Sequence, residues 1–456
     1  MPQPIKNTKR YQSWGRYPKV QNSQVEPLYW RGELPDLSAF EQSILPFGYG
    51  RSYGDSCLNN GGILLDASLM RRFIAFDTAN GILRCEAGVS LAEVLDLIVP
   101  RGWFLPVTPG TKYVSVAGAV ANDIHGKNHH AAGTFGCHVT QFELLRSNGE
   151  RLICSPDDNS EMFNATIGGL GLTGLILWVE FRLKKIESPF IVEERIRFDS
   201  LDEFWELTAD SEHDYEYTVS WLDCLSGGKK MGRGIFFRGN HATAEQAGSH
   251  KLKPKFKLRL PIDIPSFLLN TVTVRLLNEM VYRSQFAKSR QFLESYEPFF
   301  YPLDFIMDWN RGYGKQGFLQ YQCVVATSDN YRAITQILSE IRRAGEGSFV
   351  NVFKKFGDIK SPGMLSFPRP GITLALDFSY RGQRTLRFLD KLDKIVRDSG
   401  GAVYPAKDAH MSAESFQTFY PNWQDFAQYI DPNFSSSFWR RVTANGVHNG
   451  LETSSK

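Results

Sequence analysis

The residues with the most chemical potential lie at positions 109–139, in "PGTKYVSVAGAVANDIHGKNHHAAGTFGCHV". The glycines and alanines there would let a large flat ligand approach the backbone, and the polar side chains from Asn122 to His130 could contact it. A metal is the alternative, because His125 and His129 have i, i+4 spacing. That spacing brings two ligands together only on a helix, and the internal glycine of "HGKNHH" disfavours one. We therefore expect an organic ligand here and no metal.

A second glycine-rich stretch, "GYGRSYGD" at residues 48–55, comes before an expected strand, "GGILLDAS". Gly48 and Gly50 can adopt positive φ, which lets backbone N–H groups converge on an anion, and Ser52 offers a further donor. A structural turn would need the same glycines. It would not explain why a second loop of similar chemistry follows, so we expect both loops to hold a ligand.

A third stretch, "GLGLTG" at residues 169–174, matches the dinucleotide pattern GxGxxG. That pattern binds a dinucleotide only where it follows a strand and opens a helix, because the pyrophosphate sits at the helix N-terminus. Here the preceding "SEMFNATIG" has helical character, and the following "LILWVEFRL" has strand character. The order is reversed, so the match does not indicate a Rossmann domain.

In the second half of the chain, alternation with period 2 gathers polar residues on expected strands. Gln320 and Gln322 share one face of "FLQYQCV", and Lys354 and Phe356 share one face of "NVFKKFG". A sheet face with glutamines and a lysine is a poor core, but it suits a polyol or a phosphate. Trp221, in "YEYTVSWLDCL", could form a wall of such a pocket or belong to the core.

The elements that would position these residues divide into two regions. Residues 42–184 combine short strands and glycine-rich turns with few helices; "SLAEVLDLIVPRG" has Ser90 and Glu93 in capping-box spacing and is predicted to be helical. Residues 187–406 alternate strands such as "GRGIFFRG" and "GITLALDFSY" with helical stretches such as "SLDEFWELTADSE" and "GQRTLRFLDKLDKIVRDSGG". This pattern predicts an α+β fold whose second sheet has helices on one face and leaves the other face free.

The composition is that of an ordinary globular protein of 456 residues with a formal net charge of +3, which gives no indication of nucleic-acid binding. The six cysteines lack CxxC spacing, so we expect reduced thiols. We see no signal peptide and no stretch long and apolar enough to span a membrane. We therefore expect a cytoplasmic protein.

Residues 250–290 interleave basic and apolar side chains. The basic ones at the start are Lys251, Lys253, Lys255, Lys257 and Arg259. One interpretation is a solvated loop before a core helix. The other is a segment that rests on an anionic membrane surface or covers a lipid-linked substrate, since basic residues beside apolar ones have that combined affinity. The protein would then be peripheral on the inner face of the plasma membrane.

Together, "GYGRSYGD", the 109–139 stretch, "IGGLGLTG" and the downstream "AVYPAKDAHMSAESF" resemble the vanillyl-alcohol-oxidase-type FAD-dependent oxidoreductases. Within that superfamily, "DIHGKNHH" and "FLQYQ" are similar to the subgroup that oxidises polyprenyl-phosphoryl riboses. The resemblance runs over nearly the whole chain. It implies two domains: a PCMH-type FAD-binding domain at 1–185 and a substrate-binding domain at 186–410 built on an antiparallel sheet covered by helices. C-terminal helices at 411–456 would pack back on the FAD domain.

The resemblance also implies site residues, position by position. The implied cofactor contacts are Gly48, Gly50, Arg51, Ser52, Tyr53, Gly110, Thr111, Ser115, Gly118, Ala121, Asn122, His125, Gly126, Asn128, Gly174, Ile176 and Tyr404. The implied substrate contacts are Lys127, Tyr301, Gln320, Gln322, Lys354, Phe356 and Lys407. Lys407, His125 and Tyr53 are the implied catalytic residues, with Lys407 at the alcohol oxygen or the flavin edge.

Two positions differ from the pattern of the relatives. Many relatives tether FAD through a histidine where this chain has Arg51. Arginine cannot form that bond, so we expect non-covalent FAD. A relative in the ribose-oxidising subgroup carries a cysteine where this chain has Ala375. That thiol is therefore not expected to be needed for the reaction.

The implied reaction is oxidation of the ribose 2′-hydroxyl of a polyprenyl-phosphoryl-β-D-ribose to a 2′-ketone, with the hydride passing to FAD. A separate NAD(P)H-dependent reductase would reduce the ketone and complete an epimerisation that yields an arabinose donor for a cell-envelope glycan. An FAD-dependent oxidase or dehydrogenase of soluble sugars, alditols or aldonolactones is the first alternative. A flavin-binding scaffold without activity is the second.

Overall fold

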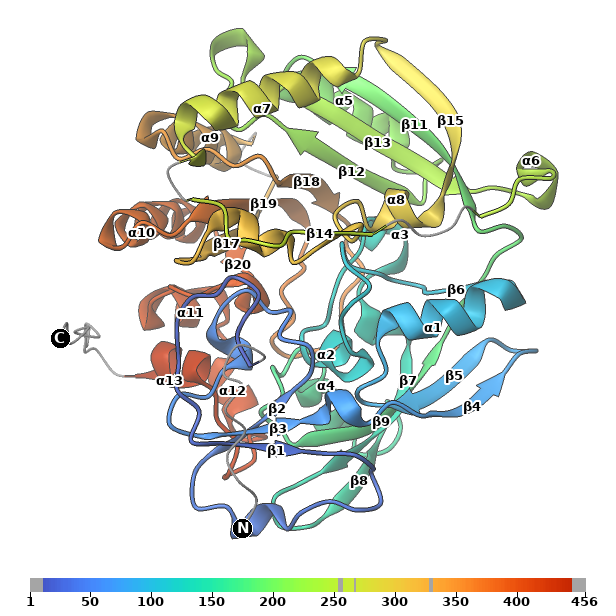
Figure 1. Cartoon of the computed structure of the whole chain (residues 1–456), viewed down its shortest axis with the longest axis vertical. Helices are drawn as coiled ribbons and strands as arrows, with labels where there is room; N and C mark the ends of the chain where they lie inside the picture. Colours follow the sequence, from blue (N-terminus) through green and yellow to red (C-terminus); the bar gives the residue numbers. More distant parts are fainter. Residues whose placement is uncertain (1–10, 253–256, 266–267, 328–330, 445–456) are drawn as a thin grey trace.

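The molecule has a sheet-rich half at each end of its long axis, as Figure 1 shows. This computed structural model describes residues 11–252, 257–265, 268–327 and 331–444. Two of the basic residues singled out in the sequence, Lys253 and Lys255, lie outside the described residues, as does the end of the C-terminal segment.

The half that contains the two glycine loops is built on two small sheets. The antiparallel sheet consists, in spatial order, of β4 (Phe73–Asp77), β5 (Ile82–Glu86), β9 (Leu175–Arg182), β7 (Val139–Leu145) and β8 (Arg151–Cys154). The parallel sheet consists of β1 (Gln24–Pro27), β3 (Ile63–Asp66) and β2 (Ile44–Phe47). The helices of this half are α1 (Leu91–Ile98), α2 (Val116–Ala121), α3 (His129–Ala132) and α4 (Ser160–Thr166).

Local sequence signals in this half are confirmed. Helix α1 begins with the expected capping box, in which the Ser90 hydroxyl accepts from the N–H of Glu93 and the Glu93 carboxylate accepts from the N–H of Ser90. The "GLGLTG" stretch lies between helix α4 and strand β9. The order helix–loop–strand is the reverse of a Rossmann turn, as the sequence predicted.

The other half is a single eight-stranded sheet. In spatial order its strands are β15 (Ser289–Ser295), β11 (Phe190–Phe198), β13 (Gly234–His241), β12 (Tyr217–Leu222), β18 (Asn351–Phe356), β19 (Gly371–Ser379), β17 (Phe318–Val325) and β20 (Ala402–Val403). Neighbouring strands are antiparallel throughout.

One face of this sheet carries helices α5 (Leu201–Ser211), α9 (Arg332–Ala344) and α10 (Gln383–Asp398). The ring of Phe353 on β18 lies 4.4 Å from that of Phe204 on α5, and the ring of Phe378 on β19 lies 5.1 Å from that of Phe388 on α10. The prediction of an antiparallel sheet with helices on one face is confirmed. The opposite face is turned toward the glycine loops.

The remaining elements join the halves or lie at the periphery. Short strands pair as β6 (Trp103–Phe104) with β10 (Lys184–Lys185), and as β14 (Leu258–Arg259) with β16 (Ile306–Met307). The other helices are α6 (Ala244–Ala247), α7 (Thr271–Ser284), α8 (Tyr296–Phe300), α11 (Ala413–Phe419), α12 (Trp423–Ala427) and α13 (Ser437–Thr443). Within the described ranges, each helix is too short or too polar to cross a membrane.

The chain after residue 411 returns to the first half. The N–H of Ser437 donates to the carbonyl of Leu58 over 2.8 Å, and Ile44 forms a β-bridge with Phe434. Arg441 on α13 donates to the carboxylates of Asp55 and Asp408 over 2.6 and 2.8 Å. The C-terminal helices therefore fasten segments of both halves to each other.

Candidate active site

The face of the large sheet opposite α5, α9 and α10 carries the polar residues that the alternation predicted. Gln320 lies opposite Asp377 and Gln322 opposite Ala375 in the β17–β19 register, and Lys354 lies opposite Thr373 in the β18–β19 register. Directly opposed residues of an antiparallel pair point to the same face. On the three strands, this face, called the catalytic face below, carries Phe318, Gln320, Gln322, Val324, Val352, Lys354, Phe356, Gly371, Thr373, Ala375, Asp377 and Ser379.

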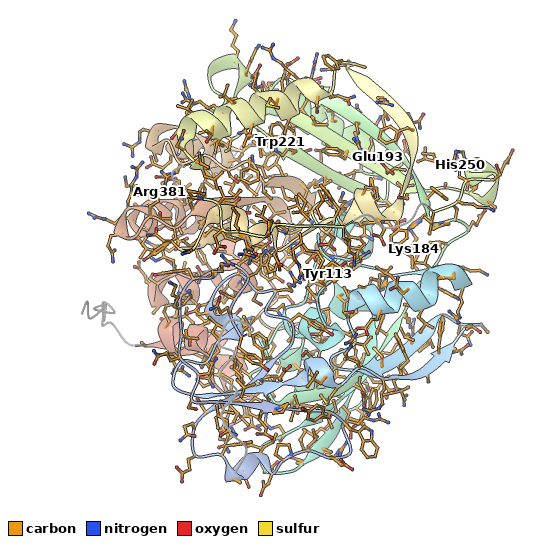
Figure 2. All side chains as sticks on the ribbon, in the orientation of Figure 1. Tyr113, Lys184, Glu193, Trp221, His250 and Arg381 are labelled. Carbon is orange, nitrogen blue, oxygen red and sulfur yellow. The ribbon has the colours of Figure 1, made fainter. Side chains whose placement is uncertain are left out.

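Trp221 also belongs to this face. Ser220 lies opposite Phe353, so Trp221 on β12 projects to the same side as Val352. Its indole N–H donates to the carbonyl of Phe349 over 2.9 Å, and the ring is half-buried. Figure 2 shows Trp221 on the upper sheet and Tyr113 at the level where the two halves meet. Of the two interpretations of Trp221, a wall beside the polar face fits better than the core.

Two segments far apart in sequence meet at the edge of this face. The N–H of Tyr53 donates to the carbonyl of Ala406 over 2.9 Å. Lys407, in the single turn η9 (Pro405–Lys407) after β20, then places its Nζ 3.9 Å from the centre of the Tyr53 ring. Both side chains are half-buried. An amine and a phenol are thereby positioned beside Gln320 and Gln322.

His125 reaches the same face from the second glycine loop. The Gln322 amide and the Nε2 of His125 lie 2.9 Å apart. Burial, with added repulsion from Lys354, holds the pKa of His125 well below its usual value. The imidazole is therefore neutral, and if its Nε2 accepts from the Gln322 amide, its Nδ1 carries the proton. Nδ1 is buried and has no partner among the residues that the structure describes, which leaves a donor for a ligand.

Two lysines on this side are held in low-dielectric surroundings. Burial lowers the pKa of Lys354 to about 7 and the pKa of Lys127 to about 8. The Lys354 ammonium donates to the carbonyl of Gly126, and the Lys127 ammonium donates to the carbonyl of Phe299. Neither forms an ion pair with a carboxylate among the residues that the structure describes. Such lysines favour an incoming anion.

Asp377 is a site residue that the sequence reasoning missed. Its carboxylate accepts from the Gln320 amide over 2.6 Å and from the Tyr313 hydroxyl over 3.2 Å. Burial raises its pKa to about 7, although Gln320 and the charge of Lys407 act in the opposite direction. The alternation of "GITLALDF", which located Ala375, could also have located Asp377.

The first glycine loop lies against the N-terminus of α2. A methyl group on Gly48 would lie 2.6 Å from the Ser115 hydroxyl, which accepts from the N–H of Gly118 over 3.1 Å. Gly50 has φ +61°, and a methyl group there would meet the carbonyl of Gln12 at 2.4 Å. Only glycine fits at these two positions.

The donors around these loops fit a large anionic cofactor. The Arg51 guanidinium lies 4.1 Å from the centre of the Trp14 ring, and its Nε is buried with no partner in the described part of the chain. The hydroxyl of Tyr113 is also buried and has no partner within the described ranges. No atom of a described residue lies within 4 Å of a methyl group built on Gly110. Unpaired donors and open backbone are what a dinucleotide needs, so the residues present fit FAD.

Other residues implied by the resemblance support this region or lie in its core. The Tyr404 hydroxyl donates to the carbonyl of Asn122 over 2.7 Å, and the Asn128 amide donates to the carbonyl of Pro106 over 2.8 Å. Tyr301 and Thr108 share a hydrogen bond of 2.7 Å. Ser52, Thr111 and Ala121 are half-buried. Gly174, directly before β9, and Ile176, on β9, are buried. The last two could reach a ligand only through their backbone.

The comparisons with known proteins agree with this geometry. The family described as FAD binding domain matches residues 35–155, which contain both glycine loops. The fold and the site thus define an FAD-dependent oxidoreductase that acts on CH–OH groups. FAD supplies the hydride acceptor when it is bound.

Full-length similarity defines the family more narrowly. The chain is 36% identical over 452 residues to decaprenylphosphoryl-beta-D-ribose oxidase of Mycolicibacterium smegmatis, which covers 95% of this chain and 97% of that protein. It is 30% identical over 372 residues to an uncharacterized protein in the mprA 5′ region of Streptomyces coelicolor, which covers 78% of this chain and all of that protein. The chain belongs to the decaprenylphosphoryl-beta-D-ribose oxidase family.

Proposed function

We propose that this protein oxidises the 2′-hydroxyl of a polyprenyl-phosphoryl-β-D-ribose to the 2′-ketone. The observation that carries the proposal is the sheet face on which Gln320, Gln322 and Lys354 adjoin the Lys407–Tyr53 pair. Amide groups and an amine on one sheet face suit a sugar with several hydroxyl groups.

Each group on this face has a role in the proposal. Gln320 and Gln322 hydrogen-bond the ribose hydroxyls, and Lys354 and Lys127 bind the phosphate. Lys407 receives the proton of the 2′-hydroxyl, because burial lowers its pKa to about 8 and a neutral amine is then accessible near neutral pH. Tyr53 and the Nδ1–H of His125 orient the sugar. Tyr301 and Phe356 complete the walls.

FAD is held without a covalent bond in this proposal. Arg51 occupies the position at which relatives carry a tethering histidine, and its unpartnered Nε suits a hydrogen bond to the cofactor. The absorbance spectrum of denatured protein tests this directly. Yellow colour released into the supernatant supports non-covalent FAD, whereas colour retained in the precipitate contradicts it.

The lipid part of the substrate is matched by the surface of α7. Val272, Leu276 and Met280 recur every four residues along its outer side and are 61–69% exposed. Arg275 and Arg283 lie on the same helix and are exposed. An apolar stripe with basic residues beside it suits the cytoplasmic leaflet of the plasma membrane, which is rich in anionic lipids. We place the protein there as a peripheral protein.

The chemistry of the proposed product, a 2′-ketone, indicates the class of enzyme that acts next. A 2′-ketone becomes the arabino epimer when a hydride is delivered to the opposite side of the ring, so the proposal includes a separate NAD(P)H-dependent reductase. Such a reductase would act next, and its product would serve as the arabinose donor of an envelope glycan.

The test is anaerobic bleaching of the flavin by two classes of sugar. Polyprenyl-phosphoryl ribose is expected to bleach it, and free pentoses and alditols are not. Lys354→Met should weaken saturation by the sugar phosphate at least ~10-fold, since a charge-assisted contact is lost. Lys355→Met is the matched control, because Lys355 points to the other face and pairs with Glu212. Bleaching by free sugars alone would refute the lipid-linked substrate.

A further inference from the structure

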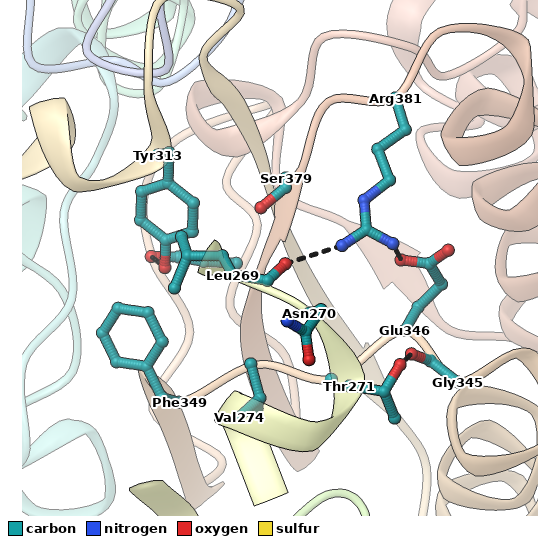
Figure 3. A pocket seen from close by; sticks show the side chains of 12 residues that line it. Leu269, Asn270, Thr271, Val274, Tyr313, Gly345, Glu346, Phe349, Ser379 and Arg381 are labelled. Atoms are coloured by element: carbon teal, nitrogen blue, oxygen red, sulfur yellow. Dashed lines mark hydrogen bonds and ion pairs between the residues drawn. The ribbon is translucent and has the colours of Figure 1, made fainter. Parts of the chain in front are cut away.

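A small cavity lies directly behind Asp377. It is lined by Tyr313, Asp377, Ser379, Glu346 and Arg381, with Leu269 and the start of α7 on its outer side. Its volume admits about one water molecule. Ser379 and Arg381 are half-exposed and Asn270 is exposed, so the cavity reaches the surface. Figure 3 shows the cavity from close by.

Several polar groups in the cavity wall are held in place by hydrogen bonds or ion pairs. Arg381 donates to the carbonyl of Leu269 over 2.7 Å and lies 3.6 Å from the carboxylate of the buried Glu346. Thr271 donates to the carbonyl of Gly345 over 2.6 Å. A water molecule there would find several hydrogen-bond partners, which is the condition for stable occupancy.

Asp377 is shared between this cavity and the catalytic face. The register with Gln320 places it on that face, and the lining of the cavity includes the same residue. The charged and titratable groups that face it are Lys407 from η9, Tyr53 from the first glycine loop, Tyr313 from η8 (Trp309–Tyr313), and Glu346 and Arg381 across the cavity. No other described carboxylate is shared in this way between the cavity and the catalytic face.

We infer that Asp377 and the cavity behind it form the exit path for the proton that the alcohol loses on oxidation. This inference rests on the proposed function, because the reaction must release a hydroxyl proton inside a buried site. It adds Asp377 as a proton carrier and the cavity as the route from the catalytic face to solvent.

The proton balance is as follows. FAD, when bound, would accept the hydride from the alcohol carbon; the O–H bond of the alcohol breaks in the same reaction, and the amine of Lys407 takes the proton. Lys407 then gives a proton to the Asp377 carboxylate through an intervening water. Asp377 gives its proton to the water in the cavity, and from there it reaches solvent. Lys407 and Asp377 return to their starting forms.

The acid strengths of the two groups suit this transfer. Burial lowers the pKa of Lys407 to about 8 and raises the pKa of Asp377 to about 7. A proton can move between groups of similar pKa without a large free-energy change. Around neutral pH the pair therefore exchanges one proton readily.

The experiment compares Asp377→Asn with Asp393→Asn. Asp393 is a buried carboxyl on α10 whose pKa is also raised to about 7, but its partner is the Tyr321 hydroxyl on the helix-covered face. Asp377→Asn should slow flavin bleaching ~10-fold or more and shift its rise with pH to lower pH, because the charge of Asp377 raises the pKa of Lys407. Asp393→Asn should leave the bleaching rate and its pH dependence unchanged. Equal rates and pH profiles for Asp377→Asn and the unaltered protein would overturn the inference.

Two further readouts do not depend on turnover of Asp377→Asn. Infrared titration of the resting protein should show a carboxylic-acid band near neutral pH that Tyr313→Phe shifts to higher pH, because a hydrogen bond to the carboxylate is lost. Ser379→Leu, which fills the cavity, should delay proton release to a pH dye relative to flavin bleaching. Absence of that band, or prompt proton release, would overturn the exit path. Failure of every sugar to bleach the flavin would instead refute the proposed function, while the infrared result would still test Asp377.

Discussion

A methyl group on Gly54 would lie only 1.7 Å from the carbonyl oxygen of Asp408. The backbone of the first glycine loop therefore packs directly on the backbone of the turn that carries Lys407. The hydrogen bond from Tyr53 N–H to the carbonyl of Ala406 belongs to the same contact. This close approach fixes the Nζ of Lys407 over the Tyr53 ring.

Gly54→Ala should separate these two segments. The clash involves backbone on both sides, so no side-chain rotation relieves it, and we expect a loss of about 1–3 kcal/mol of stability. Flavin bleaching should slow ~10-fold or more, because Lys407 and Tyr53 move apart. Gly312→Ala is the control, since no described atom lies within 4 Å of a methyl group there. Thermal unfolding and rapid-mixing absorbance measure both effects, and similar behaviour of the two variants would contradict the argument.

The pH dependence of the reaction should follow Lys407. Its pKa is lowered to about 8, chiefly by burial, so the amine is protonated at pH 6 and mostly neutral at pH 9. If the neutral amine accepts the alcohol proton, bleaching should accelerate from pH 6 to pH 9. Lys407→Met should lose ~100-fold or more of the rate and this rise with pH. Lys391→Met, on the exposed side of α10, is the control. A rate for Lys407→Met that still rises with pH would exclude Lys407 as the base.

Arg441 should stabilise both the first glycine loop and the turn that carries Lys407. It donates to Asp55, two residues after Tyr53, and to Asp408, directly after Lys407. Arg441→Met leaves two buried carboxylates facing each other, so we expect a loss of about 3 kcal/mol of stability and weaker retention of FAD. The double variant Arg441→Met with Asp55→Asn should recover part of that loss, because one charge is removed. Urea unfolding of the three proteins gives the comparison, and an unchanged midpoint for the single variant would argue against this role.

The sequence predicted those features that depend on neighbours along the chain. The capping box of α1 and the shared face of Gln320 and Gln322 follow from spacing alone. The contact of Asp55 with Arg441 joins residues 386 positions apart and arises only when the C-terminal helices pack on the first half. No local pattern could have indicated it. Asp377 lies between these cases, since alternation places it but only the tertiary structure supplies Tyr313 and the cavity.

The segment at residues 250–290 is a second case in which the sequence alone could not predict the structure. The sequence left open a solvated loop before a core helix or a membrane-contacting segment. The structure places α7 with one buried side, formed by Val274, Asn278 and Tyr282, and an outer apolar side. A helix that packs fully in a core would bury both of these sides. Which side of α7 is buried depends on tertiary packing, which the sequence alone does not show.

The outer side of α7 should bind anionic membranes. Leu276→Glu with Met280→Glu places two negative charges in the middle of the stripe, so apolar burial is lost and anionic lipids are repelled. We expect co-sedimentation with vesicles that contain phosphatidylglycerol to fall ~10-fold or more. Bleaching by a short-chain substrate analogue should be retained, because neither residue lies on the catalytic face.

Phe73→Glu is the control for this experiment. Phe73 is 40% exposed on β4, in the other half of the molecule, so its substitution adds charge without touching α7. High salt should weaken vesicle binding of the unaltered protein only in part, because the apolar contribution is insensitive to ionic strength while the basic contribution is screened. Equal vesicle binding by the double variant and by Phe73→Glu would exclude α7 as the membrane-contacting surface.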